Sequence, residues 1–413
     1  MIKPQTLKGF RDFLPSEARK RQYAIDILKK VFESYGFEPL ETPALEYEEI
    51  LLGKYGDEGD KLMYRFTDRG KRKVALRYDQ TVPLARVVAQ YGDKLPMPFK
   101  RYQIQNVWRA DNTQKGRFRE FLQCDADIVG SDSPFADAET ILVAARSLEK
   151  LGFKNFKIYI NDRNNFSYFE KTFKLTSTQV WDVIRSIDKL KKIGRGGVIN
   201  ALSKTISIDK AEEIVDSFDN IKPTENLLEI FRSLKKLGIE EKQMQFYPPL
   251  ARGLDYYTGT IFEVEIDGYS AGSVCGGGRY DNLIGLFTRN QIPAVGFAFG
   301  FDRLIEAMDE LKIFPTDVLA STTKVLVTVF NKDLLEKSLS CSLLLRSAGV
   351  QTEIYLDENV KMEKQLKYAD RKGIPYAIII GPDEASKNMV ALRNMKTREQ
   401  KTVSKEELII SLN

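Results

Sequence analysis

The chain has 413 residues, of which 43% are hydrophobic and 29% charged, and its formal net charge is +5. This composition predicts a soluble globular protein of two or three domains, and the mild charge does not by itself indicate a nucleic-acid partner. The sequence contains no histidine, which excludes imidazole as a general base, a metal ligand or a switch near neutral pH.

The sequence also argues against a membrane protein and against a protein stabilised by disulfides. No apolar run approaches the roughly 20 residues that a bilayer crossing needs, and the first residues lack the apolar stretch of a signal peptide. We therefore expect a cytoplasmic protein with no membrane contact. Cys124, Cys275 and Cys341 are far apart and odd in number, which argues against a disulfide framework or a zinc site. We expect them to be buried as small apolar side chains.

The first 130 residues predict one helix followed by strands. Ser16 is a plausible N-cap, and apolar residues recur at helical spacing from there until Gly36. Pro39 and Pro43 then favour an edge or interface strand over a central one. From about residue 64 to 130, alternating segments separated by turn residues are typical of antiparallel pairing.

The remainder divides into an insertion, a return to strands and a second domain. Residues 164–240 are mostly helical in pattern and rich in lysine, whereas strand patterns resume at 246–300 and close with a helix. After a linker, residues 322–413 show β-α-β-α-β order, which predicts a small parallel or mixed sheet with crossover helices. This stretch holds 15 Lys and Arg against 12 Asp and Glu. We therefore expect a first domain at 1–318 and a basic second domain at 322–413.

A hairpin at residues 100–130 is the most informative segment. Arg109 ends one strand, a polar loop follows, and Arg117 and Arg119 begin the returning strand. Arginines at both ends of one hairpin can hold a polyphosphate, because the guanidinium fork matches phosphate oxygens. A hairpin held together by surface salt bridges explains the same residues equally well.

Other segments carry polar residues at strand ends. Asp79 and Thr81 follow a strand, Tyr280 follows a glycine cluster that lets backbone approach a ligand, and Arg303 begins a helix. A cation in the first turn of a helix is unfavourable to the helix dipole, so Arg303 is better explained by a ligand. The segment ARGLDYYTGTIFEV at 251–264 places Arg252 and two tyrosines before a strand, and a surface turn is the plain alternative.

These segments together resemble a known family. The proline-bearing strand near Pro43, the hairpin WRAD to FLQCDAD and the strand-helix GFAFGFDRL resemble motifs one, two and three of class II aminoacyl-tRNA synthetases. The segments RGLDYY and GGGRYD resemble two peptides peculiar to the histidyl-tRNA synthetase family. The resemblance covers nearly the whole chain, and residues 322–413 resemble that family's anticodon-binding domain.

The resemblance implies both a fold and an activity. The fold is an α+β catalytic domain, with an antiparallel sheet flanked by helices, a helical insertion and a C-terminal α/β domain. The activity is activation of L-histidine with ATP, accompanied by Mg²⁺, and transfer to the 3′ end of tRNA(His). The family also implies a homodimer formed through the motif one region.

Site residues follow from the same resemblance. Arg252 and Arg109 would stabilise charge at the reacting α-phosphate, and ATP would be held by Arg109, Arg117 and Arg303. A phosphorus attacked by a carboxylate needs positioned cations rather than a base, so the absence of histidine is compatible with this chemistry. No metal ligand is assigned to a protein side chain. The residues expected to bind histidine are Asp79, Thr81, Arg109, Gln123, Asp127, Arg252, Tyr256, Tyr257 and Tyr280.

The chain departs from the family at a few positions. Asn112 and Thr113 stand where many relatives carry Arg-Pro, and Leu122 stands where histidine or tyrosine is common. The alternative from another class is a non-catalytic synthetase-like regulator of histidine biosynthesis. Such regulators lack the anticodon domain and lose the arginines, whereas this chain retains both.

Overall fold

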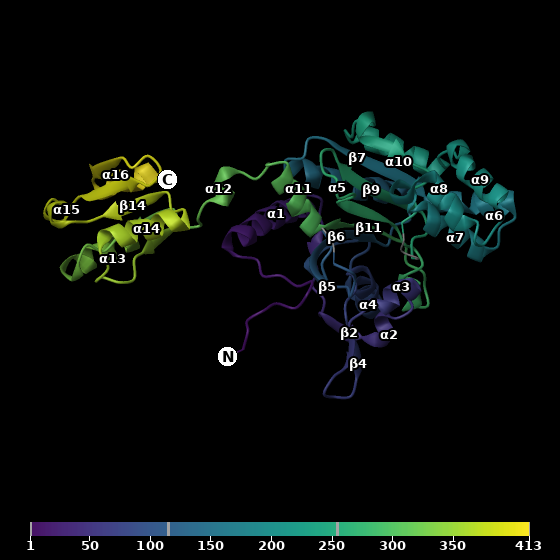
Figure 1. Ribbon diagram of the computed structural model, residues 1–413, viewed down its shortest axis with the longest axis horizontal. Coiled ribbons are helices and arrows are strands. Elements are labelled where there is room, and N and C mark those ends of the chain that lie inside the picture. The colour runs from purple at the N-terminus through teal and green to yellow at the C-terminus, as the bar shows by residue number, and fades with distance from the viewer. Residues whose placement is uncertain (1, 114–115, 253–255, 413) are drawn as a thin grey trace. The chain divides into compact units, whose positions relative to one another are not determined.

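The computed structural model describes residues 2–113, 116–252 and 256–412 (Figure 1). The chain forms two compact units, and each is described by itself. One comprises Met1–Asp12 and Arg21–Ile313, and the other comprises Phe13–Lys20 and Phe314–Asn413. Among the described helices, none combines the length and the apolar composition that a bilayer crossing requires.

A large mixed sheet forms the centre of the first unit. Its interior pairs are antiparallel, and its two outer pairs, β1 with β5 and β7 with β8, are parallel. Pro39 lies on the edge strand β1, in agreement with the prediction that proline marks an edge. In spatial order the strands are β1 (Glu38–Pro39), β5 (Phe99–Trp108), β6 (Glu120–Val129), β11 (Ala294–Gly300), β10 (Cys275–Arg279), β9 (Thr260–Ile266), β7 (Phe156–Asp162) and β8 (Met244–Phe246).

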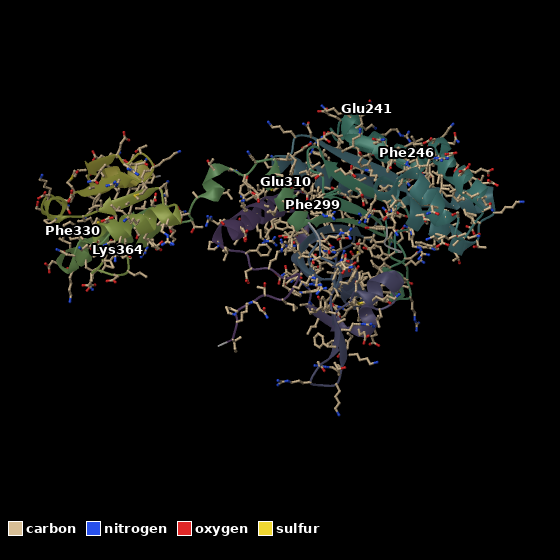
Figure 2. The ribbon with its side chains drawn as sticks, in the orientation of Figure 1. Glu241, Phe246, Phe299, Glu310, Phe330 and Lys364 are labelled. Carbon is tan, nitrogen blue, oxygen red and sulfur yellow. The ribbon has the colours of Figure 1, made fainter. Side chains whose placement is uncertain are left out.

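Helices flank this sheet and supply most of the buried apolar surface beside it. Phe299 of β11 is fully buried in the interior, whereas Glu241 lies at the surface (Figure 2). The flanking helices are α1 (Pro15–Ser34), α4 (Thr81–Tyr91), α5 (Pro134–Lys150) and α11 (Phe301–Glu310). A second, small sheet has the order β2 (Leu45–Tyr47), β4 (Lys73–Leu76) and β3 (Arg65–Thr67), beside the short helices α2 (Glu48–Leu51) and α3 (Gly56–Lys61).

The helix α4 was not expected from the sequence. Residues 81–91 lie between strand-like segments, and Pro83 in the first turn suits a helix start as well as a loop. Buried positions cover most of the helix, so the sequence lacks the polar stripe that identifies an amphipathic helix. Asp79 stabilises the start, because its Oδ1 accepts the backbone N–H groups of Thr81 and Val82.

The predicted helical insertion is present and has a core of its own. A capping box at its start joins Thr176 and Gln179. Figure 1 shows α6, α7, α8 and α9 gathered beside one end of the large sheet. The insertion helices are α6 (Ser167–Phe173), α7 (Ser177–Ile187), α8 (Leu190–Leu202), α9 (Ile208–Ser217) and α10 (Glu225–Lys236). The apolar cluster formed by α6, α7, α8 and α9 also contains Ala251, which directly precedes Arg252.

The second unit is an α/β domain with its own five-stranded sheet. The predicted β-α-β-α-β order corresponds to β12 (Val325–Val327), α13 (Leu335–Ser347), β13 (Thr352–Ile354), α14 (Met362–Lys372) and β14 (Tyr376–Ile379). The strands β12, β13 and β14 are parallel, whereas β14, β15 and β16 pair antiparallel. The remaining elements are α12 (Thr316–Leu319), α15 (Pro382–Ser386), β15 (Val390–Asn394), β16 (Gln400–Val403) and α16 (Lys405–Leu412).

Candidate active site

One cavity of about 470 Å³ in the first unit brings the predicted site residues together. It lies over β6, β10 and β11 and reaches the start of α4 and the hairpin between β5 and β6. The predicted residues that line it are Asp79, Thr81, Arg109, Arg117, Gln123, Asp127, Arg252, Tyr256, Tyr257, Tyr280 and Arg303. Arg119 does not appear among the described lining residues, and its Nε instead donates to the carbonyl of Asp111.

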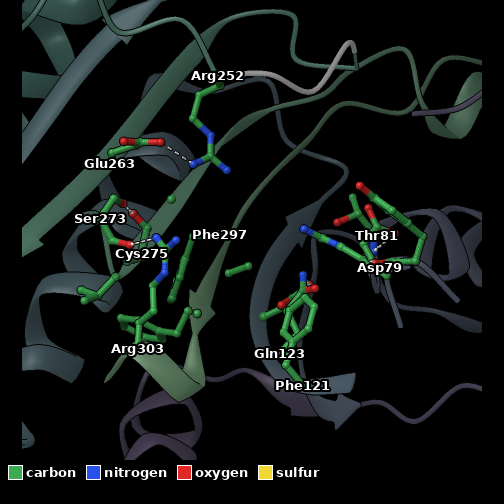
Figure 3. A pocket seen from close by; sticks show the side chains of 18 of the residues that line it. Asp79, Thr81, Phe121, Gln123, Arg252, Glu263, Ser273, Cys275, Phe297 and Arg303 are labelled. Carbon is green, nitrogen blue, oxygen red and sulfur yellow. Dashed lines mark hydrogen bonds and ion pairs between the residues drawn. The ribbon is translucent and has the colours of Figure 1, made fainter. Parts of the chain in front are cut away.

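The cavity has two chemically different walls. Figure 3 shows Arg252 and Arg303 on one side, with Asp79, Thr81 and Gln123 on the other. Cations on one wall suit phosphate oxygens, whereas carboxylate and amide groups on the other suit an ammonium group or a polar side chain. The arrangement can therefore hold an anionic and a cationic group of two ligands side by side.

Asp79 presents a buried acceptor to the cavity. Its Oδ1 accepts from Thr81 N and Val82 N, both at 3.1 Å, and from the hydroxyl of Tyr55 at 2.9 Å. Its Oδ2 has no hydrogen-bond partner among the described residues, although it is shielded from solvent. Burial raises the pKa of Asp79. A ligand ammonium at Oδ2 would supply the missing hydrogen bond and favour the ionised carboxylate.

Asp127 is held between two groups at the floor of the cavity. The hydroxyl of Tyr280 donates to Oδ1, and Nη2 of Arg101 lies 2.8 Å from Oδ2. Burial raises the pKa of Asp127, and the opposing charge of Arg101 lowers it. The strand opposite has Gly296, where a methyl group would lie 1.9 Å from Oδ1 of Asp127. Glycine is therefore required there to make room for the carboxylate.

Arg101 was not predicted as a site residue from the sequence. Its side chain is fully buried, and it lies on β5, where its charge compensates that of Asp127 beneath the cavity. The signal that could have found it is the alternation of Arg101, Gln103 and Gln105, three polar residues on one face of a strand. Gln103 and Gln105 hydrogen-bond to each other at 2.6 Å. Oε1 of Gln103 also accepts from Nη1 of Arg101 at 3.3 Å, so this polar layer contacts Arg101, the partner of Asp127.

Arg252 reaches the cavity across a glycine. Its Nη1 donates to Oε1 of Glu263 at 2.8 Å, and its Nη2 lies 3.5 Å from the hydroxyl of Tyr257. A methyl group at Gly276 would lie 2.1 Å from Nη1. Gly276, the first glycine of the cluster at 276–278, makes room for the protein's own arginine and also lines the cavity. Residues 253–255, the centre of the RGLDYY segment, lie outside the described residues.

Aromatic rings contact Arg109, and three tyrosine rings border the cavity. The guanidinium carbon of Arg109 lies 4.4 Å from the ring centre of Tyr78 and 5.2 Å from that of Phe121. Arg303 donates to the carbonyl of Ser273 at 2.9 Å. The ring of Tyr256 contacts Tyr257 and Tyr280, with centroids 4.9 and 5.9 Å away.

Arg117 is the most exposed of the four predicted arginines that line the cavity. Its side chain is 53% exposed, and its ion pair with Asp111 is 3.6 Å long. Such an exposed pair contributes little stability, about 0–1 kcal/mol. The hairpin of β5 and β6 is therefore not held together by a strong salt bridge here.

In the part of the chain that the structure describes, no group of three or more Asp, Glu or Cys side chains is arranged to hold a metal ion.

Comparisons with known proteins agree with this geometry. The family model described as histidyl-tRNA synthetase matches residues 9–304, and the one described as an anticodon binding domain matches residues 324–412. The histidine--tRNA ligase of Cytophaga hutchinsonii is 38% identical and that of Gloeobacter violaceus 40%, over 100% and 96% of both chains respectively.

Solved structures give the same result. The histidyl-tRNA synthetase from Nostoc sp. PCC 7120 superposes with a TM-score of 0.85 at 32% identity, covering 100% of this chain and 99% of that one. A protein from Bacillus halodurans C, titled an ATP phosphoribosyltransferase regulatory subunit/histidyl-tRNA synthetase, shares the fold at 21% identity and a TM-score of 0.73. It covers 89% of this chain. The profile match, the full-length identity and the fold show that the chain belongs to the histidyl-tRNA synthetase family.

Proposed function

We propose that the chain is a histidine--tRNA ligase. The histidine carboxylate attacks the α-phosphorus of ATP, pyrophosphate leaves, and histidyl-adenylate forms. A ribose hydroxyl at the 3′ end of tRNA(His) then attacks the adenylate carbonyl, and AMP leaves. The observation that carries the proposal is the single cavity in which buried carboxylates face arginines, because it fits an amino acid beside a polyphosphate.

The carboxylate wall selects the amino acid. Oδ2 of Asp79 accepts the α-ammonium group, with Thr81 beside it, and Asp127 accepts an imidazole N–H. Gln123 has a buried Oε1 without a partner among the described residues, which suits a donor on the substrate. Tyr256, Tyr257 and Tyr280 pack around the ring. An apolar analogue would leave these polar groups buried and unpaired, so it is rejected.

The arginines that line the cavity stabilise the charge that develops during the reaction. The substrate carboxylate is itself the nucleophile, so the step needs no general base. Arg252 and Arg109 bind the α-phosphate as negative charge develops on its oxygens, and Arg303 and Arg117 bind the phosphate tail. Guanidinium groups that are already oriented by Glu263 and by aromatic rings need little reorganisation during the step.

Mg²⁺ enters with ATP. The carboxylates on the arginine wall are already paired, Glu263 with Arg252 and Asp302 with Arg11 and Arg21. These paired carboxylates fit an ion that is bound mainly by phosphate oxygens and water, as Mg²⁺ prefers. Glu263, which lines the cavity, is the candidate for one added protein ligand. When bound, the ion neutralises charge on the phosphates.

The partner surfaces follow from the two domains. The catalytic domain spans 1–318, and the domain at 322–413 binds the anticodon region of tRNA(His). The homodimer forms through the motif one region, where Leu45, Tyr47 and Phe66 of the small sheet are 43%, 52% and 49% exposed. The protein works in the cytoplasm. The regulator alternative gains no support, because the arginines line the cavity and the second domain is present.

The test is histidine-dependent exchange of pyrophosphate into ATP, followed by aminoacylation of tRNA(His). We expect exchange with L-histidine and background exchange with leucine or phenylalanine. A folded protein with no histidine-dependent exchange would overturn the proposal and favour the regulator alternative.

A further inference from the structure

Arg252 adopts a backbone conformation that residues other than glycine rarely adopt. Its φ is 57°, in the left-handed region where Cβ crowds the neighbouring carbonyl. Such a conformation persists in a non-glycine residue only when surrounding contacts enforce it. From this backbone position the guanidinium reaches Glu263 across Gly276. Contacts that fix the backbone therefore also fix the cation in the cavity.

Arg163 makes such contacts. It follows β7 at the start of the insertion, and its Nη1 donates to the carbonyl oxygens of Ala251 at 3.0 Å and Arg252 at 3.1 Å. Its backbone N–H donates to the carbonyl of Gly259 at 2.8 Å. One residue thus ties both ends of the segment 251–259. Arg163 does not appear among the described residues that line the cavity, so it acts from outside.

The insertion helices hold this assembly from behind. The guanidinium carbon of Arg163 lies 4.6 Å from the ring centre of Trp181 in α7. Ala251 is fully buried in the apolar cluster of the insertion. Burial raises the pKa of Asp188, which directly follows α7, and the nearby charge and backbone N–H of Arg252 oppose that rise. The backbone on either side of the Arg252 Cα is therefore attached to the insertion.

From these contacts we infer that Arg163 is a positioning residue for Arg252, and that the helical insertion sets the place of the cation at the α-phosphate through the backbone of residues 251 and 252. The inference rests on the proposed function, because it uses the role of Arg252 in adenylate formation. A purely structural Arg163 would stabilise the insertion and leave the chemical step of the folded enzyme unchanged.

The decisive variant is Arg163→Met, which removes both hydrogen bonds and keeps an apolar stem for Trp181. We expect the single-turnover rate of adenylate formation to fall by roughly 10- to 100-fold, as for a misplaced catalytic group. The dissociation constants of histidine and ATP should change by less than about threefold, since only the transition state loses stabilisation. Arg185→Gln is the matched control, because Arg185 lies on α7 and pairs with Asp182 at an exposed site.

A double-mutant cycle tests whether Arg163 acts through Arg252. In an Arg252→Ala background, Arg163→Met should have no further effect on the rate, because the side chain that it positions is gone. If Arg163→Met fails to fold by thermal melt, Arg163→Lys serves instead, because an ammonium cannot reproduce the planar fork.

Two results would overturn the inference: a folded Arg163 variant with the wild-type rate, or an undiminished loss in the Arg252→Ala background. Failure of the proposed function looks different, because the wild-type protein itself would then form no adenylate with histidine and ATP. That result would overturn both statements.

Discussion

Gly276 lies directly under the guanidinium of Arg252, so close that a methyl group at position 276 would be 2.1 Å from Nη1. Gly276→Ala should therefore displace the guanidinium and lower the rate of adenylate formation by roughly 10²-fold, the loss expected for a misplacement of about 1 Å. Single-turnover kinetics with a thermal melt would measure this. Gly196→Ala is the control, since Gly196 lies in α8 with nothing within 4 Å of its added methyl group. Equal rates for both variants would contradict the prediction.

Removal of the Arg252 side chain should act mainly on the transition state. We expect Arg252→Ala to lower the rate of adenylate formation by roughly 10²- to 10³-fold, by analogy with the loss of one oxyanion donor. Arg252→Lys should recover only part of this, because an ammonium cannot form the same fork. Single-turnover measurement at saturating substrates decides the matter. A folded Arg252→Ala enzyme at the wild-type rate would show that RGLDYY is a surface turn before a strand.

Asp127 should control histidine binding without controlling ATP binding. Asp127→Ala removes the ion-pair partner of buried Arg101 and the acceptor for imidazole, so histidine affinity should fall by far more than ATP affinity. Calorimetry with each ligand separately measures the two effects, and ATP serves as the internal control. Normal histidine affinity in a folded variant would mean that imidazole binds elsewhere.

The pH dependence of stability should report the burial of Asp79. Burial raises the pKa of Asp79 in the folded state above its unfolded value of about 4. Between these two pKa values, the folded state therefore binds the proton more tightly than the unfolded state does. This group's contribution to stability is therefore full below about pH 4 and is lost as pH rises through the folded pKa. Asp79→Asn keeps an acceptor for Thr81 and Val82 but does not titrate. Its free energy of unfolding, relative to that of the wild type, should therefore increase as pH rises. Denaturant unfolding of the ligand-free proteins from pH 4 to 7 tests this, and a constant difference would contradict it.

The second domain should matter for tRNA rather than for adenylation. A chain ending near residue 320 should retain histidine-dependent pyrophosphate exchange and lose most aminoacylation, because the cavity is lined by residues of the first unit alone. A thermal melt and a measurement of oligomeric state would show that the truncated chain is intact. Equal loss of both activities in an intact chain would contradict this division of work.

Sequence patterns predicted the elements that have a clear period. The first helix, the hairpin at 100–130, the helical insertion and the β-α-β-α-β order of the second unit are present. Helix α4 was missed because burial on most of its faces removes the helical period. The predicted β-α-β-α-β order ends at β14, so strands β15 and β16, which follow it and complete the sheet, were missed.

The site could be predicted only in part. Resemblance to a family supplied residues from position 79 to 303, and no periodicity could have shown that they meet. Arg101 was missed because the alternation of Arg101, Gln103 and Gln105 does not show that the arginine is buried, and its role arises only when folding places Asp127 beside it. The contact between Gly276 and Arg252 could not be predicted for a similar reason. Only the fold shows that Arg252 crosses at that point.

Among the described glycines that line the cavity, Gly296 has the least room for a side chain, because an added methyl group would lie 1.9 Å from Oδ1 of Asp127. This contact limits the order in which the pocket could be redesigned. Any side chain at 296 would collide with the carboxylate, so no single substitution there is tolerated while Asp127 remains. A shorter residue at 127 would open the space that a side chain at 296 needs. A route to another amino-acid substrate that uses both positions must therefore change 127 first and 296 second, and libraries that vary 296 alone should return only glycine.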